Sequence, residues 1–513
     1  MTTSVRASDT LTRDALAVLQ PGFTGTSAPT WLLRQLDEGL VSVGLFGRNI
    51  DSPEQLALLT EQLRDVRPEL LVAIDEEGGD VTRLEAGTGS SYPGNLALGH
   101  IDDPDLTRAV AHELGSRLAA AGVNLNWAPS ADVNSNPDNP VIGVRSFGGD
   151  PELVARHTVA YVEGLQAAGV AACVKHFPGH GDTAVDSHHA MPRIDADLET
   201  LRARELVPFA AAVDAGSKCV MSAHILLPAL DEAHPGTLSP AALTGLLRAP
   251  RSEGGLGHQG LIVTDGMEMR AISATYGLER GSVLALAAGA DAICVGGGLS
   301  GEDTVLRLRD ALVRAVREGV LTEERLADAA ARVRGLAAWA RGARRSDTGG
   351  LADPALRADL TGSGAGIGLE AARRALVVTG LEGYRRPSGP LFVAALTTVA
   401  NIAVGDETPW GPAAELERMV PGTRTGTYGS ADGDVGARVP ADAGERPVVV
   451  VVRDLHRHAW MAEAVRRIAA ARPETVVVEM GVPQAPPQGA LHIATHGAAR
   501  VCGRAAAEVI ARG

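Results

Sequence analysis

Short runs of apolar residues alternate with longer amphipathic stretches through the first two thirds of the chain. The apolar runs have the length of buried strands, and the stretches between them have the apolar spacing of surface helices. We expect strands at 16–19, 41–46, 70–74, 124–128, 170–174, 219–222, 261–264 and 292–295. We expect helices at 53–66, 105–120, 151–168, 198–215 and 301–318. Eight strand–helix units predict an α/β protein with a (β/α)8 TIM-type barrel, and a doubly wound sheet is the alternative.

The pattern changes after residue 340. Residues 341–350 are rich in Gly and Arg, and they have the composition of a linker. Further strands are predicted at 376–379, 391–396, 448–452 and 475–479, with helices at 370–375 and 459–471. The Gly-, Asp- and Pro-rich segment 404–446 is expected to form loops. The predicted organisation is a catalytic barrel at 1–345, a linker at 346–369 and a smaller C-terminal α/β domain at 370–513.

Composition narrows the class of protein. The 513 residues are 45% hydrophobic and 21% charged, with a net charge of −15. An acidic chain is a poor partner for nucleic acid or for an anionic membrane. The first ten residues lack the apolar core of a signal peptide, and no apolar run approaches the length of a membrane span. The four cysteines are scattered, without a CxxC pair, so we expect reduced core residues and a cytoplasmic enzyme.

Polar residues follow one predicted strand after another. Asp75 comes directly after the third strand and Asp265 directly after the seventh. His224 follows the sixth strand, and Arg145 lies in the segment beyond the fourth. In a (β/α)8 barrel, the C-terminal ends of the strands carry the chemistry. The sequence therefore predicts an active site at this end.

The densest polar segment follows the fifth strand. Residues 174–188 contain three histidines, two aspartates and one lysine. Asp186 stands two residues before His188, so on an irregular loop the carboxylate can orient the imidazole and raise its basicity. The histidine then serves as a general acid and base near neutral pH. A divalent metal site is the alternative, but the HxH and HExxH spacings are absent, and we predict no metal.

Two further features have two interpretations each. Asp265, at a strand tip, is placed to act as a nucleophile or a metal ligand, or else to cap a helix that begins near Met267. Gly296–Gly298, after the eighth strand, could form an anion-binding nest or allow close backbone packing.

The glycine pattern at 361–368 matches a dinucleotide-binding fingerprint. No strand precedes it, however, and the chain has no Tyr-x-x-x-Lys pair, so we predict no organic cofactor.

The segment Lys175–Thr183, continued by Asp186-Ser187-His188, resembles the signature of bacterial β-N-acetylglucosaminidases of glycoside hydrolase family 3, the NagZ type. The likeness continues at three other segments: 74–83, 139–148 and 263–269. It covers about residues 15–340, and it implies the same (β/α)8 barrel that the strand count predicts.

The resemblance implies a role for each matched residue. Asp265 falls on the catalytic nucleophile, His188 on the acid/base and Asp186 on its partner. The residues that fall on groups gripping the N-acetylglucosamine are Asp75, Arg83, Arg145, Lys175 and His176. Three positions depart from the family's usual sequence. Glu76 stands where the family often has Gln. Asp80 stands where the family often has Arg, and Gly266 where it often has Asp or Ala.

These roles describe a retaining exo-acting β-N-acetylglucosaminidase for small saccharides, and the resemblance suggests peptidoglycan fragments in recycling. The alternatives are a GlcNAc phosphorylase or β-glucosidase of the same family, or a non-catalytic sugar-binding protein. Because every matched catalytic residue lies before residue 340, we expect removal of residues 365–513 to spare the catalytic constellation.

Overall fold

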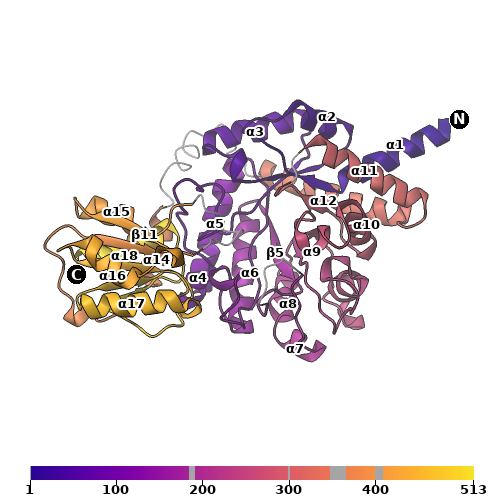
Figure 1. Ribbon diagram of the computed structural model, residues 1–513. Coiled ribbons are helices and arrows are strands. Elements are labelled where there is room, and N and C mark those ends of the chain that lie inside the picture. The colour runs from indigo at the N-terminus through magenta and orange to yellow at the C-terminus, as the bar shows by residue number, and fades with distance from the viewer. Residues whose placement is uncertain (1, 184–190, 299–300, 347–364, 399–407, 513) are drawn as a thin grey trace. The chain divides into compact units, whose positions relative to one another are not determined.

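The computed structural model describes residues 2–183, 191–298, 301–346, 365–398 and 408–512. The chain divides into two compact units (Figure 1). The first consists of Met1–Glu76, Thr107–Pro140 and Gly149–Ser363, and the second of Glu77–Leu106, Val141–Gly148 and Gly364–Gly513. Two segments of the predicted barrel region therefore group with the C-terminal part of the chain. The predicted boundaries stay a prediction, and most of the predicted linker, 347–364, lies outside the described residues.

The first unit is built on eight parallel strands that follow one another in chain order. They are β1 (Leu19–Pro21), β2 (Ser42–Leu45), β3 (Leu71–Ile74), β4 (Leu125–Asn126), β5 (Ala171–Phe177), β6 (Cys219–Ser222), β7 (Leu261–Thr264) and β8 (Ile293–Val295). Strands β2 to β7 pair in sequence, a bridge between Val263 and Ala292 joins β7 to β8, and β8 pairs with β1. The Gln20 side chain on β1 donates to Ser42 Oγ on β2 (2.5 Å). This order confirms the predicted barrel and not the doubly wound alternative.

Helices surround these strands (Figure 1). They are α1 (Thr2–Ala17), α2 (Thr30–Glu38), α3 (Pro53–Val66), α5 (Pro104–Ala120), α6 (Pro151–Ala167), α7 (Leu198–Ala203), α8 (Leu206–Asp214), α9 (Arg270–Ser273), α10 (Leu278–Ala288), α11 (Glu302–Arg317) and α12 (Glu323–Ser346), with a π-helix at Ala241–Arg248. The predicted starts at Pro53 and Pro151 are confirmed. In each case a residue just before the proline, Ser52 or Asp150, accepts a backbone N–H of the first turn.

Two predicted elements of this unit are wrong in detail. The first strand was expected at 16–19, but α1 continues to Ala17 and β1 begins only at Leu19. The helix expected at 198–215 is broken into α7 and α8. Between them the buried carboxylate of Glu205 pairs with Arg204 (2.5 Å), and the Arg204 backbone leaves the helical region.

The second unit contains a six-stranded sheet in the order β11-β10-β12-β13-β14-β9. Its strands are β9 (Val377–Thr379), β10 (Phe392–Leu396), β11 (Arg424–Tyr428), β12 (Val448–Val452), β13 (Val476–Glu479) and β14 (Leu491–Ala494). All pairs are parallel except β14 with β9. Its helices are α4 (Asn95–Ile101), α14 (Ala365–Arg374), α15 (Ala413–Met419), α16 (Val435–Ala443), α17 (Ala459–Ala471) and α18 (Arg500–Arg512). The predicted second α/β fold is confirmed.

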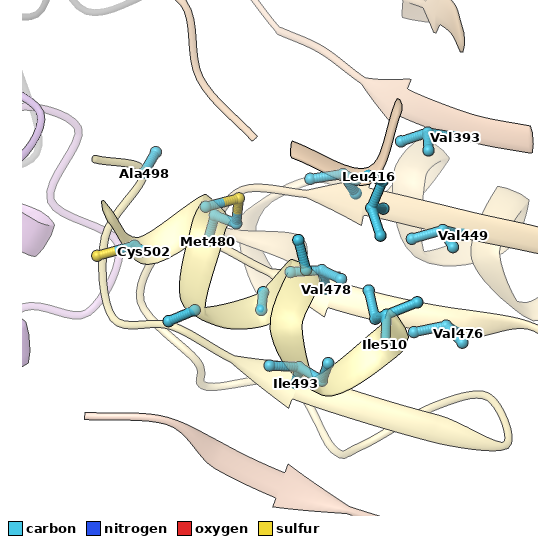
Figure 2. Close-up of a cluster of buried hydrophobic side chains, with 14 of the residues drawn as sticks. Val393, Leu416, Val449, Val476, Val478, Met480, Ile493, Ala498, Cys502 and Ile510 are labelled. Atoms are coloured by element: carbon cyan, nitrogen blue, oxygen red, sulfur yellow. The ribbon is translucent and has the colours of Figure 1, made fainter. Parts of the chain in front are cut away.

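Helices cover both faces of this sheet. One apolar core holds side chains of α14, α15 and α18 against the strands, and a second core holds side chains of α16 and α17. Figure 2 shows the first core, with Ile510 and Cys502 of α18 near Val478 and Met480. Parallel strands buried on both faces are nearly all apolar, as the five valines of β12 are.

The loops predicted for 404–446 are wrong where the structure describes this segment. Residues 408–446 contain α15, β11 and α16. Strand β14 was not predicted either. The glycine pattern at 361–368 lies outside the described residues up to 364, and its last four residues begin α14. No helix in the described ranges combines the length and the apolar character needed to cross a membrane.

Candidate active site

The C-terminal strand ends of the first unit bring together charged and imidazole side chains. Following the strands from β3 to β7, these are Asp75, Asp132, Lys175, His176, His224 and Asp265. Strand β5 continues to Phe177, three residues beyond the predicted end. Lys175 and His176 are therefore held by the strand itself and not by the loop that follows it.

Lys175 on β5 forms an ion pair with Asp75, which directly follows β3; strand β4 lies between these two strands in the sheet. Lys175 Nζ lies 2.5 Å from Asp75 Oδ1, and the lysine side chain is only 2% exposed. The turn after Asp75 is fixed by Asn126 on β4, whose side-chain oxygen accepts Glu76 N–H (3.0 Å) and whose amide donates to Glu76 O (2.7 Å). The predicted sugar-binding residues Asp75 and Lys175 are thus adjacent and rigidly placed.

Asp132 organises the β5 segment. Its Oδ2 accepts Nδ1–H of His176 (2.7 Å), and its Oδ1 accepts the backbone N–H groups of His176 (3.2 Å) and His180 (2.7 Å). Burial would raise the pKa of the Asp132 carboxyl, but the His176 and His180 groups around it outweigh burial and lower this pKa. Asp132 therefore remains a carboxylate and holds the His176 ring in one orientation.

The loop after β5 is also fixed from the segment after β4. The Asn139 side-chain amide donates to the carbonyls of His180 (2.8 Å) and Gly181 (3.0 Å). A Cβ atom at Gly181 would lie 1.7 Å from the Val133 carbonyl oxygen, so only glycine fits there. These contacts fix the loop up to Thr183. The predicted pair Asp186 and His188 lies outside the described residues.

His180 is a neutral, buried imidazole. Thr183 Oγ1 donates to the His180 carbonyl (3.0 Å), so it accepts Nδ1–H of the ring (2.7 Å). Nε2 then has a lone pair, and among the described residues it has no hydrogen-bond partner. Burial, with His176 nearby, lowers the pKa of His180 to about 4.

Asp265 stands at the tip of β7. Its backbone N–H donates to the Ser222 carbonyl on β6 (3.1 Å), and its Oδ1 accepts Gly266 N–H (2.8 Å). The buried His224 donates from Nε2 to the Gly266 carbonyl (3.0 Å). Helix α9 begins only at Arg270, so the interpretation of Asp265 as a helix cap is wrong. The turn presents a fixed carboxylate at the end of the barrel.

The predicted anion nest after β8 is filled by a carboxylate from the same unit. The backbone N–H groups of Gly296 (3.0 Å) and Gly297 donate to Glu268 Oε1. Glu268 Oε2 is buried and has no hydrogen-bond partner among the described residues. Arg48 donates to the carbonyls of Gly296 and Gly297, so the glycine segment is held from both sides.

The other two predicted sugar-binding residues belong to the second unit. Arg145 is buried and pairs with Glu77, with Nη2 to Oε1 at 2.6 Å and Nε within 3.2 Å of both carboxylate oxygens. Arg83 lies on the same loop as Glu77, three residues after the buried Asp80. The described parts of the chain contain no group of three or more metal-ligating side chains arranged around a common point.

Asp132, Glu77, His180 and Glu268 were not assigned roles from the sequence. A usable signal existed for Asp132 and Glu77, because both closely follow predicted strands, as Asp75 and Asp265 do. Glu268 has the same signal, four residues after the predicted strand at 261–264, but its partner glycines, 28 and 29 residues away, could not be read from the sequence.

Comparisons with known proteins agree on one family for this chain. Residues 32–336 match the family described as "Glycosyl hydrolase family 3 N terminal domain". A protein named beta-hexosaminidase A, from Pseudoalteromonas piscicida, is 35% identical over 313 residues, which is 56% of this chain and 52% of that protein. A beta-hexosaminidase from Chromobacterium violaceum is 38% identical over 258 residues, 49% of this chain and 70% of that protein.

A solved structure resembles the whole chain. A glycoside hydrolase family 3 beta-N-acetylglucosaminidase from Paenibacillus sp. str. FPU-7 is 33% identical with a TM-score of 0.84. The match covers 98% of this chain and 96% of that one, so it includes the second α/β fold as well as the barrel.

Proposed function

Because this chain belongs to glycosyl hydrolase family 3, we propose that it is a retaining, exo-acting β-N-acetylglucosaminidase that releases terminal N-acetylglucosamine. The names of its relatives support this substrate. The observation that carries the proposal is the fixed Asp265 carboxylate at the end of a barrel that also places the Lys175–Asp75 pair and the His176–Asp132 pair at its strand ends.

Asp265 is the nucleophile that attacks the anomeric carbon, and a covalent glycosyl-enzyme forms. His188 protonates the leaving oxygen and then removes a proton from the water that releases the sugar, while Asp186 orients the ring. Asp75, Lys175, His176, Arg83 and Arg145 bind the hydroxyl and acetamido groups. Peptidoglycan fragments recycled in the cytoplasm are the substrates that the family resemblance favours.

The nucleophile is tested by Asp265→Asn. The variant should lower kcat for p-nitrophenyl N-acetyl-β-glucosaminide by a factor of about 10^4 or more, because no other group replaces the attacking carboxylate. A 5-fluoro glycoside should trap a covalent adduct, and peptide mapping should place it on Asp265. An adduct on another residue, or a variant with wild-type turnover, would contradict the assignment.

The acid/base is tested by His188→Ala. A good leaving group needs little protonation, so the loss should be far larger on a natural disaccharide than on the p-nitrophenyl glycoside. Asp186→Ala should show the same pattern more weakly. Product analysis by NMR in phosphate buffer distinguishes hydrolysis from phosphorolysis, since N-acetylglucosamine 1-phosphate as the main product would make the protein a phosphorylase. Full activity of both variants on the disaccharide would remove the pair from the mechanism.

A further inference from the structure

The loop after β3 carries a buried carboxylate that the proposed mechanism does not use. Asp80 is 6% exposed, and both of its oxygens are engaged within the second unit. Oδ1 accepts the backbone N–H of Ala498 (2.7 Å), and Oδ2 pairs with Arg453. A carboxylate that is buried and fully paired in this way fixes the backbone that bears it.

Both partners of Asp80 come from strand ends of the six-stranded sheet. Arg453 directly follows β12, and its guanidinium carbon lies 5.4 Å from the centre of the Trp410 ring. Ala498 lies between β14 and α18, so its N–H precedes the first turn of a 13-residue helix. The positive end of the helix dipole favours a negative charge there. Asp80 therefore occupies a site prepared by residues of the C-terminal part of the chain.

A second set of contacts holds the following part of the same loop. Arg500, at the start of α18, donates to the Gly89 carbonyl (3.2 Å) and to Ser91 Oγ (2.5 Å), and it pairs with Glu85 (3.2 Å). Glu85 in turn accepts from the N–H (2.8 Å) and the hydroxyl (2.6 Å) of Ser91. The segment from Asp80 to Ser91 is thus attached at both ends to the same sheet–helix assembly.

The short connection from Asp80 to Arg83 is rigid. Glu77 and Val81 are joined by a backbone hydrogen bond (3.1 Å), which closes a tight turn around Asp80. Gly79 has a φ of +63°, and a Cβ atom there would lie 2.4 Å from the Gly94 backbone. Val81 and Thr82, the two residues between Asp80 and Arg83, are both fully buried. A displacement of Asp80 is therefore passed on to Arg83.

We propose that Asp80 is a positioning residue for Arg83, and that residues 364–513 act on sugar binding by holding Asp80 through Arg453 and Ala498. This inference rests on the proposed function, in which Arg83 binds the sugar. It gives a reason for the departure at position 80, because the arginine common in the family would meet the like charge of Arg453 and could not accept the Ala498 N–H. It also reverses the expectation that removal of residues 365–513 would spare catalysis.

The test uses the full-length protein with Asp80→Ala, Asp80→Asn and Arg453→Met. Asp80→Ala should lower kcat/KM for the p-nitrophenyl glycoside about a hundredfold, chiefly by raising KM, since Arg83 is displaced without being removed. Asp80→Asn should restore part of this loss, because its amide oxygen still accepts the Ala498 N–H. Arg453→Met should lower kcat/KM about tenfold.

Arg374→Met is the matched control. It removes the exposed ion pair with Asp103 (2.8 Å) in the same unit, and kcat/KM should change by less than about twofold. Unchanged KM in a folded Asp80→Ala protein would overturn the proposal. If Asp80→Ala does not fold, Arg453→Met decides in the same way, since the Arg453 side chain is 24% exposed and its loss is better tolerated.

Amide hydrogen exchange gives a readout that does not depend on turnover. Asp80→Ala and Arg453→Met should both accelerate exchange in peptides covering 77–92 and leave the β5 peptide unchanged. Equal exchange rates in wild type and both variants would overturn the positioning role whatever the activity. A wild-type protein that does not cleave the glycoside, but shows the expected exchange, would instead contradict the proposed function.

Discussion

Asp132 and Asp80 have the same structural role, but their hydrogen-bond donors come from different parts of the chain. Each is a buried carboxylate that follows a barrel strand and fixes a loop by accepting backbone N–H groups. The backbone N–H donors to Asp132 are those of His176 and His180, which belong to the next strand and its loop, 44 and 48 residues along the chain. The backbone N–H donor to Asp80 is that of Ala498, 418 residues along the chain.

The proposed sugar-binding residues therefore lie on two loops that are held in place by different units. The β5 loop is held by its neighbours in the barrel, so its geometry follows from the packing of the first unit alone. The β3 loop is held by strand ends of the second sheet. The sugar-binding residues proposed on these two loops therefore depend on different parts of the chain for their placement. Substitutions of the two aspartates should accordingly disturb different units.

Among the tests of this comparison, the largest effect is expected from Asp132→Ala. It leaves the N–H groups of His176 and His180 without their acceptor in a buried site, and the His176 ring without its partner. We expect the free energy of unfolding to fall by about 3–5 kcal/mol. We also expect kcat/KM to fall by about a hundredfold or more at a temperature where the variant is folded. Urea denaturation and steady-state kinetics measure the two quantities.

Hydrogen exchange sharpens the comparison for Asp132. Peptides covering β5 and its loop should exchange faster in Asp132→Ala, while peptides covering 77–92 should not. Asp132→Asn is the control, because one of its two oxygens remains an acceptor and a smaller loss is expected. Faster exchange at 77–92 in Asp132→Ala would contradict the separation of the two supports.

A smaller effect is expected from pH. His180 in the first unit and His496 in the second both have a folded-state pKa of about 4, in each case chiefly because burial disfavours the charged ring. The unfolded chain, with a histidine pKa near 6.5, binds the proton more tightly. Each buried ring therefore leaves stability unchanged above about pH 6.5 and lowers it as the pH falls from there to about 4.

At pH 5 each ring should lower the free energy of unfolding by about 2 kcal/mol relative to pH 7. Urea denaturation of wild type, His180→Asn and His496→Asn at both pH values measures this. Each variant should lose less stability on acidification than wild type. The smaller loss should be found for the unfolding of the unit that carries the substitution. Equal losses in all three proteins would show that neither ring is neutral because of burial.

The sequence predicted most of the barrel because its information there is local. Strands such as β6 and β7 are short apolar runs followed at once by a polar residue, and this pattern needs no knowledge of distant partners. It failed for β1, where a short apolar run fits a helix end as well as a strand. It also failed for β11, a strand of Arg, Thr, Gly and Tyr whose conformation comes from its pairing with β10.

The sequence by itself determined the fold class, the family, and the strand end at which Asp265 lies. Only the tertiary structure decided which groups hold the site in place. Asp132 accepts a hydrogen bond from the His176 ring, Glu268 accepts the N–H of Gly296, and Asp80 accepts the N–H of Ala498 next to the second sheet. The physical reason is that the patterns that predict strands and loops depend on residues close to one another in the sequence. A buried carboxylate instead takes its partners from whichever N–H groups the folded chain brings to it, and the order of residues does not reveal that choice.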